Sequence, residues 1–226
     1  MKKLATALLA SAMALGAFSA AQAGEIAVIV KTVNSTFWQD VQKGADAAMK
    51  DVSEHTMTFQ GPAAESAIAD QVNMVENAVN RGVAGIVLAP SDPDALVPAV
   101  KKAWEARIPV VIIDSMLAEG AEQYYQSFLA TDNKKAGELA AQALIDKVGT
   151  EGKIAVMSYV AGAGSEIGRV GGFTDYIKAN SKLEIVGPFY SQSQMATALN
   201  QTTDVLAANS DLKGMFGANE PTPIGT

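Results

Sequence analysis

The sequence predicts an α/β fold of two doubly wound parallel-sheet lobes joined by a hinge, with the second lobe incomplete. Short apolar runs rich in β-branched residues recur along the chain, and a segment with helical spacing of apolar residues follows almost every one. Continuous apolar runs are typical of strands buried on both faces of a parallel sheet. Regular alternation of such strands with helices is typical of a doubly wound fold.

The amino-terminal segment, residues 1–23, is predicted to be a secretory signal peptide outside the fold. Two lysines at positions 2 and 3 form a positive start, residues 4–18 are apolar, and Ala21-Gln22-Ala23 fits a cleavage site. A membrane anchor is the alternative, but the apolar run is shorter than the roughly 20 residues of a spanning helix. An exported chain without cysteine indicates a bacterial periplasm.

The first lobe is expected to comprise residues 24–132. Gly61-Pro62 breaks its second strand, and prolines 90 and 93 bound the turn after its third. The predicted strands are 26–30, 56–60, 85–89, 110–114 and 126–130. The predicted helices are 37–52, 65–80 and 94–106, each with apolar residues on one face.

The second lobe is expected to comprise residues 133–226, after a short crossover near 131–134. Its predicted helices are 133–148, 166–180 and 195–209, and its predicted strands are 153–158, 184–189 and 214–217. No later strand closes this lobe, and we therefore expect a chain that is truncated at its carboxyl terminus.

The segment EIAVIVKTVNSTFWQD, residues 25–40, is predicted to organise the binding site. It passes from a buried strand through a polar loop into a helix, with Asn34 and Ser35 among the plausible N-cap residues. Phe37 and Trp38 then lie on the first helical turn, at the carboxyl end of a strand, where ligands bind in open α/β sheets. Their rings could face a ligand, although one of them could instead pack into the core.

Several segments together resemble the type I periplasmic sugar-binding proteins, the ribose, allose and galactose group that serves ABC importers. The segments are VKTVNSTFWQDVQKGADAA, GIVLAPSDPDAL, IPVVIIDS, FLATDN, GSEIGRVGGF and FGANEP. The resemblance covers essentially all of residues 24–226. It implies two hinged lobes with a monosaccharide or related polyol in the cleft, delivery to an ABC permease in the inner membrane, and a monomer whose lobes are free to close.

The resemblance also implies roles for individual residues. Phe37 and Trp38 match an aromatic pair that stacks on the sugar ring. Asp114 matches an aspartate that accepts hydrogen bonds from sugar hydroxyls, and Arg169 and Asn219 match polar residues of the second lobe. We expect Asn34 and Ser35 to bind the ligand as well.

Other positions depart from the family pattern. Ribose binders carry an arginine where this chain has Ser115, and many relatives carry an asparagine where it has Ala89. An aromatic residue is common near Ser193, and an aspartate is common at the position of Glu220. These departures argue against ribose as the ligand.

The composition argues against several other classes of function. The net charge of −7 argues against nucleic acid as a partner, which requires a basic surface. One histidine and no cysteine leave little material for a transition-metal site or a Ser-His triad, so we expect no metal, cofactor or catalysis.

Three functions other than transport are compatible with parts of the sequence pattern. A sensory receptor that reports to a chemoreceptor or sensor kinase without transport stays open. A dinucleotide-dependent enzyme is suggested by Gly162-Ala163-Gly164, but Ile167 stands where the third glycine of that motif belongs. A DNA-binding repressor of the same fold would carry a helix-turn-helix where this chain has the predicted signal peptide.

Overall fold

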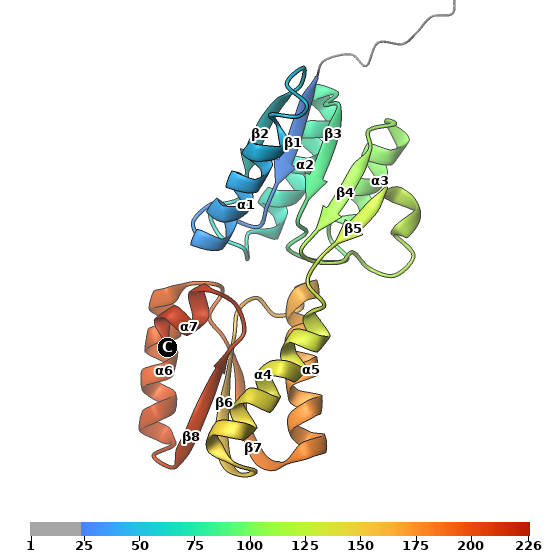
Figure 1. Cartoon of the computed structure of the whole chain (residues 1–226). Coiled ribbons are helices and arrows are strands. Elements are labelled where there is room, and N and C mark those ends of the chain that lie inside the picture. The colour runs from blue at the N-terminus through green and yellow to red at the C-terminus, as the bar shows by residue number, and fades with distance from the viewer. Residues whose placement is uncertain (1–23) are drawn as a thin grey trace, which may run out of the picture.

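The computed structural model describes residues 24–226, and the predicted signal peptide lies outside the described residues. The chain forms two α/β lobes, one above the other in Figure 1, and crosses between them once within residues 24–226, between β5 and α4. None of the helices in this part of the chain is long and apolar enough to cross a membrane.

The first lobe is built on a five-stranded sheet in the order β2-β1-β3-β4-β5, in which all neighbouring strands are parallel. Its strands are β1 (Glu25–Ile29), β2 (Thr56–Gln60), β3 (Gly85–Leu88), β4 (Val110–Ile113) and β5 (Ser127–Leu129). Its helices are α1 (Thr36–Ala48), α2 (Ile68–Arg81), α3 (Val97–Glu105) and the short η1 (Glu122–Tyr124).

Helices cover both faces of this sheet. Ala27 and Ile29 of β1 lie in one buried cluster with residues of α2 and α3. Val28, between them, lies in a second cluster with Trp38 of α1. Successive residues of a strand point to opposite faces, so a run that is apolar throughout fits a strand with helices on both sides.

The second lobe is built on a three-stranded parallel sheet in the order β7-β6-β8. Its strands are β6 (Glu151–Ser158), β7 (Lys182–Tyr190) and β8 (Leu212–Gly217). Its helices are α4 (Asn133–Val148), α5 (Gly164–Asn180), α6 (Met195–Ala208) and α7 (Pro221–Gly225). The α/β class with parallel sheets in two lobes is thus confirmed.

Most predicted elements are present. The largest differences lie at helix ends, and β6, β7 and β8 each begin two residues earlier than expected. The helix expected over 37–52 ends at Ala48, and the helix expected over 65–80 begins only at Ile68, which leaves Glu65 in a loop. The helix expected over 94–106 begins at Val97, because the Asp92 carboxylate accepts two backbone N–H groups and forms a turn there. The short helices η1 and α7 were not predicted.

The helices α4 and α5 approach each other closely through glycine. A Cβ atom at Gly172 of α5 would overlap the carbonyl oxygen of Lys134, and one at Gly137 of α4 would overlap that of Arg169. Because Arg169 is one of the predicted site residues, this helix contact fixes the backbone position of a predicted ligand-binding residue.

We therefore expect Gly172→Ala to lower the free energy of unfolding by about 1–3 kcal/mol, the usual cost of overpacking a close contact. Gly171→Ala is the matched control, because a Cβ atom at this neighbouring position meets nothing within 4 Å. It should leave stability unchanged or raise it by up to about 1 kcal/mol through helix propensity. Urea denaturation measures the free energy of unfolding of both variants. An equal loss of stability in the two would contradict the close contact between α4 and α5.

Candidate functional site

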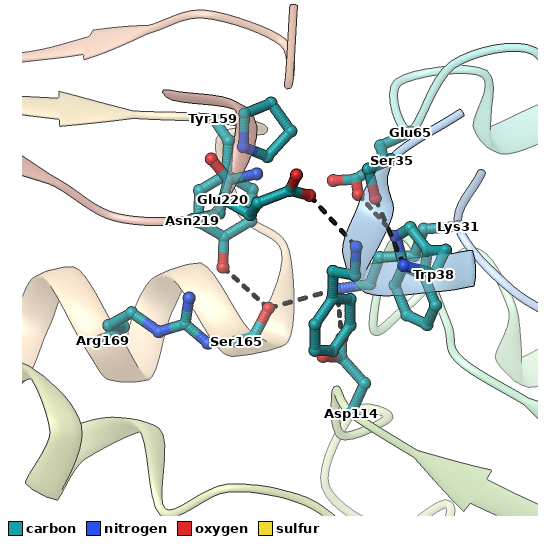
Figure 2. Close-up of a pocket in the computed structure, with 12 residues that line it drawn as sticks. Lys31, Ser35, Trp38, Glu65, Asp114, Tyr159, Ser165, Arg169, Asn219 and Glu220 are labelled. Atoms are coloured by element: carbon teal, nitrogen blue, oxygen red, sulfur yellow. Dashed lines mark hydrogen bonds and ion pairs between the residues drawn. The ribbon is translucent and has the colours of Figure 1, made fainter. Parts of the chain in front are cut away.

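A cavity of about 70 Å³ lies where the two lobes meet. Its walls come from loops and helix starts that follow the carboxyl ends of strands in both lobes, the usual ligand position in open α/β sheets. The residues that line it are Lys31, Ser35, Phe37, Trp38, Glu65, Asp114, Tyr159, Ser165, Arg169, Asn219, Glu220 and Pro221. Figure 2 shows them converging from the two sides.

The structure brings most of the predicted site residues together. Those that line the cavity are Ser35, Phe37, Trp38, Asp114, Arg169 and Asn219. Asn34 lies outside it, in an adjoining cavity of about 170 Å³, and its side-chain amide donates a hydrogen bond to the Ala63 carbonyl oxygen.

The two aromatic residues at the start of α1 have different environments. Ser35 is the N-cap, and its hydroxyl oxygen accepts a hydrogen bond from the Trp38 backbone N–H. Trp38 is only 2% exposed and belongs to the core cluster, whereas Phe37 is 47% exposed. Their rings pack edge to face, with ring centroids 4.9 Å apart, and both residues line the cavity. Trp38 is therefore part of the core and also part of the cavity wall.

Lys31 places a buried positive charge beside the cavity. Its side chain is 3% exposed, and its Nζ lies 2.7 Å from Asp114 Oδ2. The same Nζ donates hydrogen bonds to the hydroxyls of Ser115 at 2.6 Å and Ser165 at 3.1 Å. The three donors of the ammonium group therefore all have partners, as a buried charge requires. Ser165 belongs to the second lobe, so this contact crosses between the lobes.

Asp114 is held in place from several sides. The Ser115 hydroxyl also donates to Asp114 Oδ2 at 3.0 Å. The Asp114 backbone has φ 63°, a left-handed conformation that aspartate tolerates better than most residues. Among residues 24–226, no hydrogen bond engages the other carboxylate oxygen, Oδ1. This oxygen is available to a ligand hydroxyl.

Arg169 is anchored within the second lobe. Its Nε and Nη2 donate to Asn133 Oδ1 at 3.1 and 2.6 Å, and its Nη1 donates to the Ala218 carbonyl oxygen. A guanidinium group has five N–H donors, so two remain for a ligand. Asn219 has a double role, because its Oδ1 accepts hydrogen bonds from Thr222 at the start of α7 while its amide nitrogen donates to the Ser193 hydroxyl, which lies at the adjoining cavity.

The loop after β6 and the first turn of α5 supply two more hydroxyl groups. Tyr159 and Ser165 are joined by a hydrogen bond of 2.8 Å between their side-chain oxygens. Burial raises the pKa of the Tyr159 phenol far above its usual value, so this group stays protonated. Behind the loop, the Glu166 carboxylate accepts hydrogen bonds from the Ser158 hydroxyl and the Gly162 backbone N–H.

Six cavity residues were not predicted as ligand-binding residues: Lys31, Glu65, Tyr159, Ser165, Glu220 and Pro221. For Lys31, the sequence offers one signal, namely a lysine that directly follows a predicted buried strand. The Gly/Ala-rich loop that carries Tyr159 suggests a phosphate loop from its sequence, and nothing in that pattern indicates a ligand-binding tyrosine. The helical spacing of apolar residues predicts a helix that begins at Glu65, whereas in the structure this residue lies in the loop before α2.

Comparison with known proteins identifies the family. A model of the periplasmic binding protein domain matches residues 26–226. The chain belongs to the periplasmic binding protein family. The D-allose-binding periplasmic protein of Escherichia coli (strain K12) is 31% identical over 212 residues, which cover 92% of this chain and 68% of the relative. Ribose import binding protein RbsB of Bacillus subtilis (strain 168) is 28% identical, and the match covers 88% of this chain.

The match spans 63% of the length of the Bacillus subtilis relative. Among solved structures, an ABC transporter solute binding protein from Agrobacterium vitis with bound D-fucose superimposes with a TM-score of 0.89 and is 87% identical. That match covers 89% of this chain and 70% of the other. These relatives are binding proteins of the periplasmic type, and none of them is named as an enzyme.

The environment of Glu166 leads to a prediction about pH. Burial raises the pKa of this carboxyl above its ordinary value of 4.5. Between those two pKa values the unfolded chain releases the proton while the folded chain still holds it, so stability falls as pH rises through this window. Relative to Glu166→Gln, the wild-type free energy of unfolding should therefore decrease as pH rises above 4.5 toward the raised pKa of the folded protein. Urea denaturation at each pH measures it, and a constant or rising difference would contradict the buried carboxyl.

Proposed function

We propose that the protein is a non-catalytic periplasmic receptor that captures a monosaccharide or related polyol between its lobes and delivers it to an ABC importer. One observation carries this proposal: Asp114 of the first lobe faces Arg169 and Asn219 of the second across a single cavity with Trp38 in its wall. Charged groups hydrogen-bond sugar hydroxyls strongly, and aromatic faces cover the apolar patches of a sugar ring.

Residues 24–132 and 133–226 would act as the two ligand-binding lobes, and residues 1–23 would direct export to the periplasm. The cavity is about 70 Å³ and is crossed by direct contacts such as Lys31 to Ser165, so a sugar would enter only when the lobes separate. Closure around the ligand on a hinge is a known transition of periplasmic binding proteins. A monomer with free lobes and an inner-membrane permease as partner fit this cycle.

D-Fucose is the first ligand to test. The support is the Agrobacterium vitis protein, which is 87% identical to this chain and holds D-fucose in its structure. D-Ribose is a weaker candidate, because Ser115 stands where ribose binders carry an arginine and here bonds Lys31. The importer names of the relatives favour transport over a purely sensory role.

The test is a Trp fluorescence titration with D-fucose, D-galactose, L-arabinose and D-ribose. Trp38 and Trp104 are the two tryptophans of the chain, and Trp104→Phe leaves Trp38 as the reporter. We expect a saturable signal with D-fucose at micromolar concentration, about −8 kcal/mol, and weaker binding of D-ribose. Asp114→Asn should weaken binding about ten- to a hundredfold, since it removes a charged acceptor.

The control is Trp38→Phe, in which the sugar-dependent signal should disappear. A folded protein that shows no saturable response to any of the four sugars would overturn the monosaccharide proposal.

A further inference from the structure

Glu65 lies between a buried tryptophan and the opposite lobe. This residue sits in the loop between β2 and α2 and is 5% exposed. Its Oε1 accepts a hydrogen bond from the indole Nε1–H of Trp38 at 3.0 Å. Its Oε2 accepts one from the Ser193 hydroxyl, at 2.7 Å, and Ser193 belongs to the second lobe, in the loop after β7. Both oxygens of one buried carboxylate are thus engaged, on different sides of the cleft.

Ser193 continues the connection into the second lobe. Its hydroxyl oxygen accepts a hydrogen bond from the Asn219 amide at 3.0 Å. Ser193 and its neighbour Gln192 have φ values of 58° and 56°, both in the left-handed region that residues other than glycine rarely adopt. Such strain persists only where the surrounding structure enforces it, and it concentrates at functional sites.

We infer that Glu65 is a positioning residue that, through Ser193, fixes Trp38 of the first lobe and Asn219 of the second in their sugar-binding arrangement when the cleft is closed. This inference rests on the proposed function, because it assigns Trp38 and Asn219 to the sugar site. Ser193 would stabilise the closed cleft by its hydrogen bond to the Glu65 carboxylate.

The bridge can exist only in the closed arrangement. Glu65 and Ser193 are 128 positions apart in the chain and belong to lobes that are linked once within residues 24–226, so separation of the lobes separates them. A second hydrogen bond also joins the two lobes. The Glu220 carboxylate of the second lobe accepts a hydrogen bond from the Phe37 backbone N–H of the first at 3.3 Å. Hydrogen bonds to carboxylates are roughly twice as strong as neutral ones, and their loss should therefore act on the release of the ligand.

The test compares the rate at which D-fucose dissociates from the wild type and from Ser193→Ala, both in the Trp104→Phe background. Stopped-flow fluorescence of Trp38 follows the release. We expect a dissociation rate constant about tenfold higher in Ser193→Ala, with the association rate constant nearly unchanged. In the sugar-saturated protein, quenching of Trp38 by acrylamide should also increase.

The matched control is Ser181→Ala. The Ser181 hydroxyl donates to the Ile177 carbonyl oxygen and accepts from the Leu183 backbone N–H, both within the second lobe, so its loss removes two hydrogen bonds without touching the cleft. Its sugar dissociation rate should equal that of the wild type. A wild type that binds no sugar would overturn the proposed function. A wild type that binds, with Ser193→Ala releasing sugar at the same rate, would overturn the bridge alone.

A double-mutant cycle separates the bridge from unrelated damage. Glu65→Gln keeps the shape of the side chain but leaves one acceptor oxygen for two donors. If the bridge is direct, Glu65→Gln combined with Ser193→Ala should release sugar no faster than the more affected single variant. Fully additive effects of the two substitutions on the dissociation rate would contradict the inference.

Discussion

The rest of the site depends on the buried charge of Lys31. An ammonium group that is 3% exposed is stable only with hydrogen-bonding partners, and it finds them in Asp114 and Ser115 of the first lobe and Ser165 of the second. This one charge therefore orients the Asp114 carboxylate and draws the start of α5 toward the first lobe. Loss of Asp114, the ionic partner of Lys31, would leave an uncompensated buried charge, which generally costs about 3–5 kcal/mol.

The parallel sheets explain why these groups meet. Lys31 follows β1, Asp114 follows β4 and Asn219 follows β8, so side chains far apart in sequence gather at the carboxyl edges of two sheets that face each other. Anchoring within each lobe then limits how far they can move. Arg169 is fixed by Asn133 at the first turn of α4, and the glycine contact between α4 and α5 holds its helix close.

The sequence was sufficient for the strands and for much of the candidate site. The strand over 56–60 and the helix over 133–148 were predicted with the bounds that the structure has, because clear breakers or caps flank them. Phe37 and Trp38 were predicted from their place after a buried strand, and Asp114 from the resemblance to sugar-binding proteins; all three line the cavity. Whether they bind the ligand stays a prediction.

Other features could not be predicted, because they depend on contacts between distant segments. The partners of Lys31 lie 84 and 134 positions away, and no local pattern indicates them. The helical spacing of apolar residues in α2 extended the predicted helix over Glu65, and only tertiary structure shows that this carboxylate reaches Trp38 and Ser193.

A crystal structure of the protein grown with D-fucose would show directly whether the sugar binds between the lobes. We expect a sugar in the cavity, with its ring against Trp38 and its hydroxyls within hydrogen-bond distance of Asp114 Oδ1 and the two available donors of Arg169. A sugar bound outside the cavity, or within it but without contacts to Asp114 and Arg169, would contradict the proposed function.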